Sequence, residues 1–447
     1  MPERGVLVRL GRLATRSRLR RLLLVRLLGQ GGDGVFQAGL ASLLIFSPER
    51  QPSPAAVATA FAVLLLPFTL VGPWAGVALD RWRRRQVLVG ANAVRAGVVM
   101  ATAAVLHAGA PDAAVVVMAL LALSVNRALL AGLSAALPHV VEPDELVLAN
   151  SVVPTAGTMA AGAGALTAVL ARSGPLEGLA GGGAAADAAL LVMAAVAYLA
   201  AGLSALRIPV GSLGPVRPPG APLPGSLRRS RGSRLVTMGR DLLGGARHVV
   251  QRRAPAWALT VVAVHRFAFG VTTVAFVVLC RRTLADPDDP AAGLALLTTL
   301  LVAAGAGAGT AAVCAPWGTR HGALRAWICG CLVVAGAAQA LAGWSTDLTV
   351  LLVCAFALGG AGQGAKIGVD TVVQRTVDDT YRGRVFTLYD LVFNVTFVVA
   401  AAVAALLLPP DGRFPVLATC LGGGYWAMAW LYRRVGPAPR ALAPAGA

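Results

Sequence analysis

The chain has 447 residues, of which 57% are hydrophobic and only 13% are charged. A soluble domain typically carries about 25% charged residues, so these few charges exclude a water-soluble protein of this length. The net charge of +19 does not indicate a nucleic-acid-binding protein. The arginines cluster in short stretches between apolar segments, a distribution typical of proteins embedded in a lipid bilayer.

Apolar runs long enough to cross a bilayer core of about 30 Å recur along the whole chain. Each is expected to be helical, because an isolated strand leaves its backbone groups unsatisfied in hydrocarbon. The first run follows basic residues, as in a signal peptide, but no small-residue cleavage site follows it, so we predict an uncleaved first span. The predicted spans are 21–46, 54–79, 87–109, 112–136, 148–171, 185–206, 255–280, 291–316, 326–344, 348–373, 385–408 and 414–432.

The connections between the spans alternate in basicity. Nearly all arginines of the connections and tails fall on the side that also receives both termini. The other side receives only Arg50, Arg172, Arg281, Arg282 and Arg413. The positive-inside rule therefore predicts a multi-pass protein of the inner (plasma) membrane with both termini in the cytoplasm.

The spans divide into two sets of six. An offset of 236 positions places Gly34 of the first span on Gly270 of the seventh. Two halves of equal orientation form a parallel repeat. We predict an all-α integral membrane fold of twelve transmembrane helices, with a first bundle (1–206), a basic cytoplasmic linker (207–254) and a second bundle with the tail (255–447). The end of the linker, from Gly239 to Arg253, is expected to form a basic amphipathic helix.

Neither a cofactor nor a metal site is predicted. All six cysteines lie in or beside apolar segments, and Cys329 and Cys331 have no second pair at metal-ligand spacing. The glycine run 305–309 lies within a span and is not followed by the residues of a phosphate-binding loop. No constellation of nucleophile and base is evident, so we do not expect an enzyme.

Three stretches resemble the major facilitator superfamily, and within it the drug and siderophore exporters of the macrolide-efflux and enterobactin-exporter type. The first is Gly29–Gln37 in span 1, and the second is Gly76–Arg85, which is similar to the superfamily's signature loop after span 2. The third is Leu137–Asn150, echoed in the second half by Arg382–Asp390. The chain departs from the family pattern at Arg83, which replaces a glycine of the signature loop.

Two further departures concern coupling. The second-half loop 317–322 lacks the acidic residue of the signature. The antiporter motif of span 5 survives only as Gly157, Gly162 and Gly164, without its proline. These differences weaken the expectation of obligate proton antiport but not that of the fold.

The resemblance implies a monomeric secondary transporter that alternates access around a midplane site. Its expected activity is proton-coupled export of a small amphipathic compound such as a drug, an antibiotic or a siderophore. An importer or a lipid translocator on the same scaffold is an alternative. A third possibility is a sensor-like membrane protein that has kept the fold and does not transport.

Ionisable residues inside the spans are the candidate site residues, because each costs roughly 2.5–3.5 kcal/mol at a helix centre. In span 1, Gln30, Asp33 and Gln37 follow helical spacing and share one face with Arg26. Asp33 either binds a proton or a cationic substrate group, or is permanently paired with an arginine of another span. We expect Arg127 of span 4 to be its counter-charge, and Arg95 to be a structural partner rather than a substrate ligand.

The second half carries its own polar face. Gln363, Lys366 and Asp370 of span 10 lie at helical spacing, and Lys366 is the only lysine of the chain. Lysine loses its charge on burial more readily than arginine, so Lys366 is a candidate for coupling or substrate contact. The alternative is a self-satisfied pair of Lys366 with Asp370. Arg266 of span 7 is expected to complete a substrate-facing set.

The signature-like loop has a mechanical interpretation. Its candidate gating residues are Gly76, Asp80, Arg81, Arg84 and Arg85. An aspartate there can oppose the positive N-terminal end of a helix such as span 11 and so lock an inner gate. The alternative, compatible with the first, is that the arginines only determine topology.

Overall fold

The computed structural model describes residues 11, 15–40, 53–63, 65, 82–109, 111–172, 183–214, 243–286, 288–319 and 323–437. Within these ranges all regular structure is helical, and nine helices are long and apolar enough to cross a membrane. Gly76, Asp80 and Arg81 of the signature-like loop lie outside the described residues. The second predicted span is described over its first part, as the helix Pro54–Val63.

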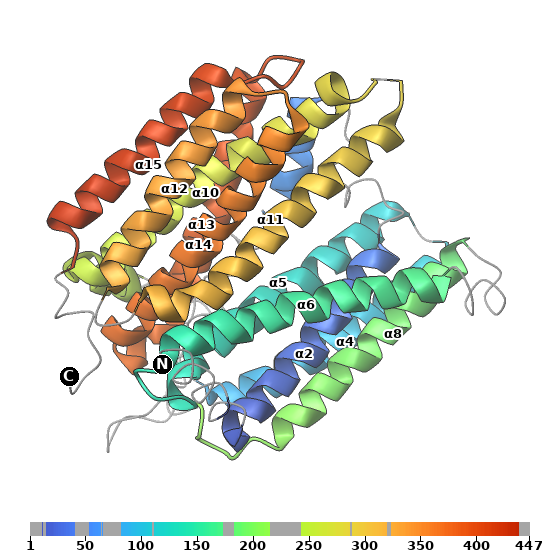
Figure 1. Cartoon of the computed structure of the whole chain (residues 1–447). Helices are drawn as coiled ribbons and strands as arrows, with labels where there is room; N and C mark the ends of the chain where they lie inside the picture. Colours follow the sequence, from blue (N-terminus) through green and yellow to red (C-terminus); the bar gives the residue numbers. More distant parts are fainter. Residues whose placement is uncertain are drawn as a thin grey trace. The chain divides into compact units, whose positions relative to one another are not determined.

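The long helices follow one another in the order of the predicted spans (Figure 1). Before the linker they are α2 (Ser17–Gly39), α4 (Arg84–His107), α5 (Asp112–Ala136), α6 (Leu146–Arg172) and α8 (Gly183–Leu206). After it come α10 (Arg253–Leu279), α11 (Pro290–Gly318), α12 (Leu324–Trp344), α13 (Leu348–Thr376), α14 (Asp379–Leu407) and α15 (Pro415–Val435). A 3-10 turn, η3 (Leu137–His139), follows α5, and a π-helical turn, η4 (Cys280–Leu284), follows α10.

Most helix boundaries lie within a few residues of the predicted spans, and two helices begin earlier than the spans predicted for them. Helix α14 begins at Asp379 rather than at 385, and α2 begins at Ser17 rather than at 21. In α14 the added turn is polar, so hydropathy alone does not mark it. Asp379 in that first turn is favourable there, because a carboxylate stabilises the positive end of the helix dipole.

The chain forms two compact units. Unit 1 comprises the described residues within Met1–Phe46, Pro67–His248 and Val377–Leu391. Unit 2 comprises those within Ser47–Leu66, Val249–Thr376 and Val392–Ala447. This partition by contacts is distinct from the two predicted six-helix halves, which stay a prediction.

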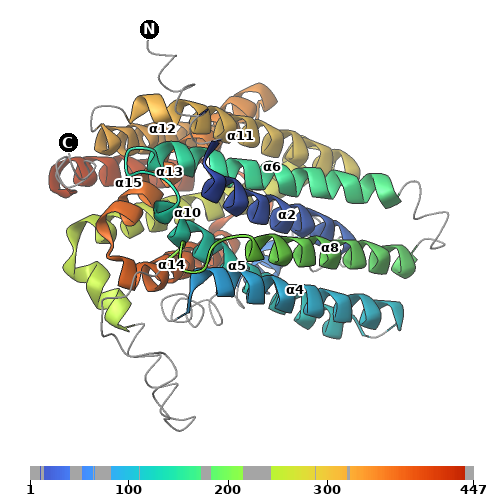
Figure 2. The same cartoon turned by 90° about the horizontal axis from the view of Figure 1, so that it is seen from below.

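In unit 1, α2 packs against α6 and α8, and α4 packs against α8 and α5 (Figures 1 and 2). Its apolar core forms two clusters, one around Leu22 and Leu88 and the other around Phe36 and Tyr198. In unit 2, α13 packs against α10, α11 and α12, while α15 covers α12 and α10. Its core gathers the apolar faces of these helices and of α14.

Glycines bring α2 into backbone contact with α6. A Cβ at Gly34 would overlap the carbonyl oxygen of Ala161, and a Cβ at Gly164 would overlap the carbonyl oxygen of Gly31. A Cβ at Gly32 would lie 2.7 Å from the ring of Tyr198 in α8. The absence of side chains at these glycines therefore permits the close approach of α2 to α6 and α8.

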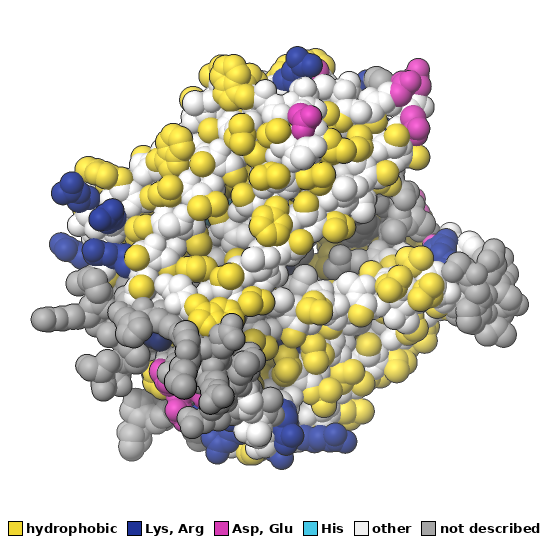
Figure 3. Space-filling model, in the orientation of Figure 1, with side chains coloured by type: hydrophobic (Ala, Val, Ile, Leu, Met, Phe, Trp, Pro, Cys, Tyr) yellow, Lys and Arg dark blue, Asp and Glu magenta, His cyan; other side chains and the backbone are white. Residues whose placement is uncertain are grey.

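The outer surface is apolar along the helices. Large side chains such as Leu203, Val117 and Leu406 are exposed. In Figure 3, hydrophobic side chains spread along the helices and Lys and Arg side chains gather at helix ends. Such a surface suits a lipid environment, where exposed apolar groups carry no cost.

Candidate functional site

Asp33 of α2 is a buried charge of unit 1 with partners on both carboxylate oxygens. Its Oδ1 forms an ion pair with Arg95 of α4 and accepts a hydrogen bond of 3.0 Å from the Tyr198 hydroxyl of α8. Its Oδ2 accepts a hydrogen bond of 2.9 Å from the Asn126 amide of α5. The guanidinium of Arg95 also stacks over the Tyr198 ring, 3.8 Å from its centroid. One carboxylate thus holds side chains from three other helices.

The expected pairing of Asp33 with Arg127 was wrong. Arg127 lies 4.0 Å from Asp390 of α14, and Arg95 is the ion-pair partner of Asp33. The reason is helix register: one residue is a turn of about 100°, so α5 presents Asn126 to Asp33 and directs Arg127 to another side. The interpretation of Asp33 as a carboxylate paired with an arginine of another span describes this arrangement.

The sequence reasoning missed Asn126 and Tyr198. Tyr198 is fully buried in the middle of an apolar helix. A hydroxyl buried there normally needs a hydrogen-bond partner, and that requirement was the available signal. Asn126 stands directly beside Arg127 in the sequence, and only the register of α5 distinguishes the two.

The other polar residues of span 1 do not join this cluster. The Nε of Arg26 donates to Oε1 of Gln30 at 2.8 Å, and Gln30 packs at Gly157 of α6. Gln37 is exposed. The polar residues predicted to share one face of this helix therefore have different neighbours in the structure.

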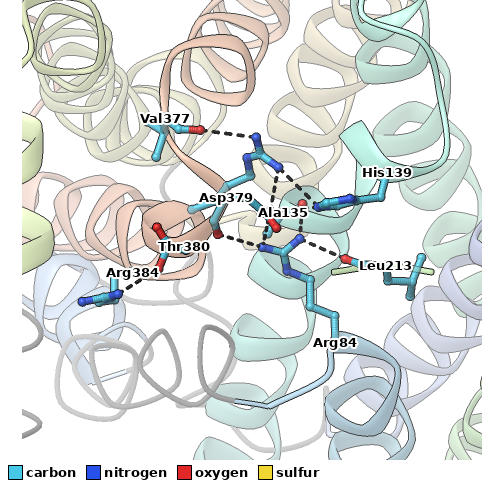
Figure 4. A network of polar contacts seen from close by, with 9 residues as sticks. Arg84, Ala135, His139, Leu213, Val377, Asp379, Thr380 and Arg384 are labelled. Carbon is cyan, nitrogen blue, oxygen red and sulfur yellow. Dashed lines mark hydrogen bonds and ion pairs between the residues drawn. The ribbon is translucent and has the colours of Figure 1, made fainter. Parts of the chain in front are cut away.

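A second network surrounds Asp379, the first residue of α14 (Figure 4). Its Oδ1 lies 3.0 Å from Nη2 of Arg84, 2.8 Å from Nε2 of His139 and 2.9 Å from Nη1 of Arg382. We call these four residues the Asp379 network, and all of them belong to unit 1. A single carboxylate oxygen thus connects the start of α4, the turn after α5 and the first turns of α14.

Arg84 is the buried centre of this network. Its side chain is 0% exposed, and Nη1 donates to the carbonyl oxygens of Ala135 at 3.0 Å and Leu213 at 2.9 Å. The arginine therefore also binds a carbonyl at the C-terminal end of α5, where cations are favoured. Arg84 of α4 thus contacts the start of span 11 through Asp379. Asp80, the loop residue expected to oppose that helix end, lies outside the described residues.

Other arginines at this end of unit 1 bind helix ends and a loop. Arg85 donates to the carbonyl oxygen of Leu206 at 2.9 Å, and Arg21 donates to that of Arg207 at 2.7 Å, so both cap the end of α8. Arg16 binds Glu142 at 2.5 Å, and this hydrogen bond raises the pKa of Arg16 above its usual value. Arginines expected to determine topology thus also satisfy carbonyls that a helix end leaves unpaired.

In unit 2, Lys366 and Asp370 of α13 form an ion pair of 2.5 Å along one helix. This is the Lys366–Asp370 pair of the alternative interpretation, although Oδ1 of Asp370 is buried without a hydrogen-bond partner among the described residues. Asp370 is buried and Lys366 is half-buried. Gln363, one turn before Lys366, is half-buried as well.

Arg266 of α10 lies among aromatic rings. Its guanidinium carbon is 3.7 Å from the ring centroid of Phe393, 4.7 Å from that of Phe397 and 5.0 Å from that of Phe269. The sequence reasoning selected Arg266 but missed this phenylalanine cage. The phenylalanines lie at positions 393, 397 and 269 in two helices, so helical spacing links only the first two.

No group of three or more His, Cys, Asp or Glu side chains that could hold a metal ion occurs among the residues the structure describes. The contacts described above are ion pairs, hydrogen bonds and aromatic contacts. Asp33, Lys366 with Asp370, and Arg266 each place charge within a long helix, whereas the Asp379 network lies at helix ends.

Comparison with known proteins identifies the family. No family model matches the chain. Uncharacterized MFS-type transporters from Mycobacterium bovis and Mycobacterium tuberculosis are each 38% identical over 396 residues, which is 89% of this chain and 86% of theirs.

Similar solved structures support the same fold. A bacterial homologue of the iron transporter ferroportin, outward-facing, has a TM-score of 0.65 at 17% identity and covers 95% of this chain and 98% of its own. A human organic anion transporter has a TM-score of 0.66 at 17% identity, with coverages of 92% and 99%. A proton:xylose symporter has a TM-score of 0.66 at 12% identity, with coverages of 94% and 96%. The chain, an all-helical multi-pass membrane protein, belongs to the major facilitator superfamily of transporters.

Proposed function

We propose that this transporter exports small amphipathic compounds, such as a drug, an antibiotic or a siderophore, in exchange for protons. It works as a monomer, is not an enzyme, and lies in the plasma membrane with both termini in the cytoplasm. Its two six-helix halves, 1–206 and 255–447, alternate access around a midplane site. The names of the similar solved structures mention iron, organic anions and xylose, so the fold alone does not determine the substrate.

The observation that carries the proposal is the bonding of Asp33. Its carboxylate is 4% exposed and holds donors from α4, α5 and α8. Protonation would remove the charge that attracts Arg95 and would weaken both other hydrogen bonds. Proton binding would therefore alter the packing of four helices at once, which is the differential interaction that coupling requires. A charge that crosses 100 mV supplies about 2.3 kcal/mol.

The surroundings of Arg266 support an amphipathic substrate. The phenylalanine cage offers apolar contact area, and the guanidinium offers donors for a polar group. Gln30, Gln37, Arg127, Gln363, Lys366 and Asp370 are the further residues that we assign to substrate or proton coupling. Ionisable groups within a membrane span are costly and are retained chiefly where they serve transport.

We assign the gate to the Asp379 network together with Gly76, Asp80, Arg81 and Arg85. Support comes from Arg84, because one buried guanidinium connects three segments of the chain through Asp379, Ala135 and Leu213. Opening of the gate requires that these bonds separate and that water reaches Arg84.

Efflux of a panel of fluorescent dyes and antibiotics tests this function, in cells that express wild type or Asp33→Asn, with and without a protonophore. Asp187→Asn is the matched control, because Asp187 is also buried and paired with an arginine, Arg172, but lies near a helix end. We expect efflux by wild type and by the control, and its loss in Asp33→Asn and with the protonophore. Export that persists under both perturbations would contradict proton coupling through Asp33.

Accumulation of a compound in expressing cells, rather than depletion, would instead favour an importer or a lipid translocator. Ligand binding without counterflow in proteoliposomes would favour a sensor-like protein. The ion pair of Asp33 with Arg95 gives this last alternative its support, since a permanently paired carboxylate needs no proton.

A further inference from the structure

A pocket of about 650 Å³ opens in unit 2 where the ends of α10, α13 and α15 meet. Its walls include Arg252 and Arg253 at the start of α10, Thr376 at the end of α13, and Arg434 in the last turn of α15. We call it the arginine pocket. It contains none of the residues assigned above to transport or gating.

The arginine pocket is strongly positive. Three guanidinium groups line it, and no carboxylate occurs among the described residues that do so. The first N–H groups of α10 are not capped by a side chain of the preceding residue, and they add the positive end of a helix dipole. Three exposed cations and a helix N-terminus at one pocket together favour an anion with several oxygens.

Contacts with neighbouring residues hold two of the pocket arginines in place. Nη1 of Arg252 donates to the carbonyl oxygen of Thr376 at 3.2 Å, which attaches the start of α10 to the end of α13. The guanidinium of Arg434 lies 5.8 Å from the ring centroid of Trp430. Arg253 is exposed at the start of α10.

Aromatic residues indicate the depth of the pocket in the membrane. Trp430 is 59% exposed on α15, and Trp257 of α10 packs edge-on against Tyr432 at a centroid distance of 6.4 Å. Trp and Tyr concentrate where hydrocarbon gives way to lipid headgroups. Helices α10 and α13 are both apolar and long enough to cross a membrane, so their shared end lies at headgroup level.

We propose that the arginine pocket binds the phosphate of an anionic phospholipid. Guanidinium groups bind phosphate oxygens in pairs, and such bonds are stronger than those between neutral groups. The positive-inside rule assigns this end of the helices to the cytoplasm, where the anionic lipids of a membrane attract basic pockets between helices. The lipid's acyl chains then lie along the exposed apolar face of α15.

Native mass spectrometry of the purified full-length protein tests the lipid. The protein is released from bilayers of equal phosphatidylglycerol and phosphatidylcholine, and the retained lipids are counted. The test variant is Arg253→Gln with Arg434→Gln. The matched control is Arg282→Gln with Arg413→Gln, which removes two exposed arginines near the opposite end of the same unit, where Thr283 bonds the carbonyl of Asp411. Arg252 is left intact because it bonds Thr376.

We expect wild type and the control to retain phosphatidylglycerol preferentially. The preference should fall about fivefold for each pocket arginine removed, and Arg434→Lys should keep most of it because the charge remains. Equal retention of both lipids by wild type, or an equal loss in test and control variants, would overturn the proposal.

A second measurement distinguishes a lipid headgroup from free phosphate. Inorganic phosphate is added at millimolar concentration to the protein in detergent, and thermal unfolding is followed. A lipid site predicts stabilisation by phosphatidylglycerol and little by inorganic phosphate. Equal stabilisation by both, lost in the test variant, would assign the pocket to a free anion and overturn the lipid assignment. Neither result depends on the efflux experiment.

Discussion

The Tyr198 hydroxyl and the Arg95 guanidinium meet at the same carboxylate oxygen of Asp33, while the guanidinium also stacks on the tyrosine ring. Each of the three side chains therefore contacts the other two, and they come from α8, α4 and α2. A closed arrangement of this kind makes the loss of one member costly to both others. The charge of Asp33 and the packing of these three helices in unit 1 therefore depend on each other.

Replacement of Arg95 by Met should destabilise the protein by about 3–5 kcal/mol, because it leaves the charge of Asp33 buried and uncompensated. The double variant Arg95→Met with Asp33→Asn should recover much of this loss, because no charge is then buried. The free energy of unfolding in detergent measures both. If the double variant were as unstable as the single one, packing rather than charge would explain the loss.

Gly34→Ala should destabilise the contact of α2 with α6 by roughly 1–3 kcal/mol, because a Cβ there would overlap the carbonyl oxygen of Ala161. Gly162→Ala is the matched control, since a Cβ at Gly162 meets nothing within 4 Å. That variant should be neutral or more stable by up to about 1 kcal/mol, the helix propensity gained over glycine. The melting temperatures of the purified variants test this prediction. An equal change in melting temperature in both variants would contradict the contact.

Asp379→Asn should lower stability more than Asp378→Asn. Asp379 neutralises the fully buried Arg84, whereas Asp378 is 52% exposed and lies 3.9 Å from His248. Leaving a buried charge unpaired costs about 3–5 kcal/mol, while an exposed pair contributes about 0–1 kcal/mol. Thermal unfolding of both variants measures the difference, and an equally large effect of Asp378→Asn would count against the Asp379 network.

Lys366→Met should impair transport more than the double variant Lys366→Met with Asp370→Asn. The single change leaves Asp370, which is buried, without the cation that lies 2.5 Å from it. The double change removes both charges, and the helix keeps its shape. Uptake or efflux rates in proteoliposomes compare the two, with protein amounts matched by blotting. A double variant that transports as fast as wild type would contradict the assignment of Lys366 and Asp370 to substrate or proton coupling.

Much of the fold was predictable from the sequence, because hydropathy and the basic connections carry physical signals of crossing a bilayer. The predicted span 112–136 coincides with α5, from Asp112 to Ala136. The start of α14 was missed because its first turn is polar, and polarity there reflects the bonding of Asp379 rather than a loop. Hydropathy reports contact with lipid, so it does not report helix that extends beyond the hydrocarbon.

The candidate site was less predictable, because pairing depends on the rotation of helices about their axes. The sequence identified Asp33 as an unusual buried charge and Arg95 as a structural partner. It did not indicate that Asn126 rather than Arg127 faces Asp33. It offered the pair of Lys366 with Asp370 as one of two interpretations, because both lie on one helix at a spacing of four residues. Partners on the same helix can be inferred from spacing, whereas partners on different helices require the register of both.

The backbone contact of α2 with α6 also restricts how this protein can diverge during evolution. Gly34 lies against the backbone at Ala161, and Gly164 lies against the backbone at Gly31. A methyl group at either position would push the helices apart and so break the other contact. Because each clash is with a backbone carbonyl, no substitution of a side chain on the facing helix can relieve it. We therefore expect related sequences that keep this helix contact to retain both glycines. Related sequences that have lost one glycine should vary rapidly in residue type at the position of the other.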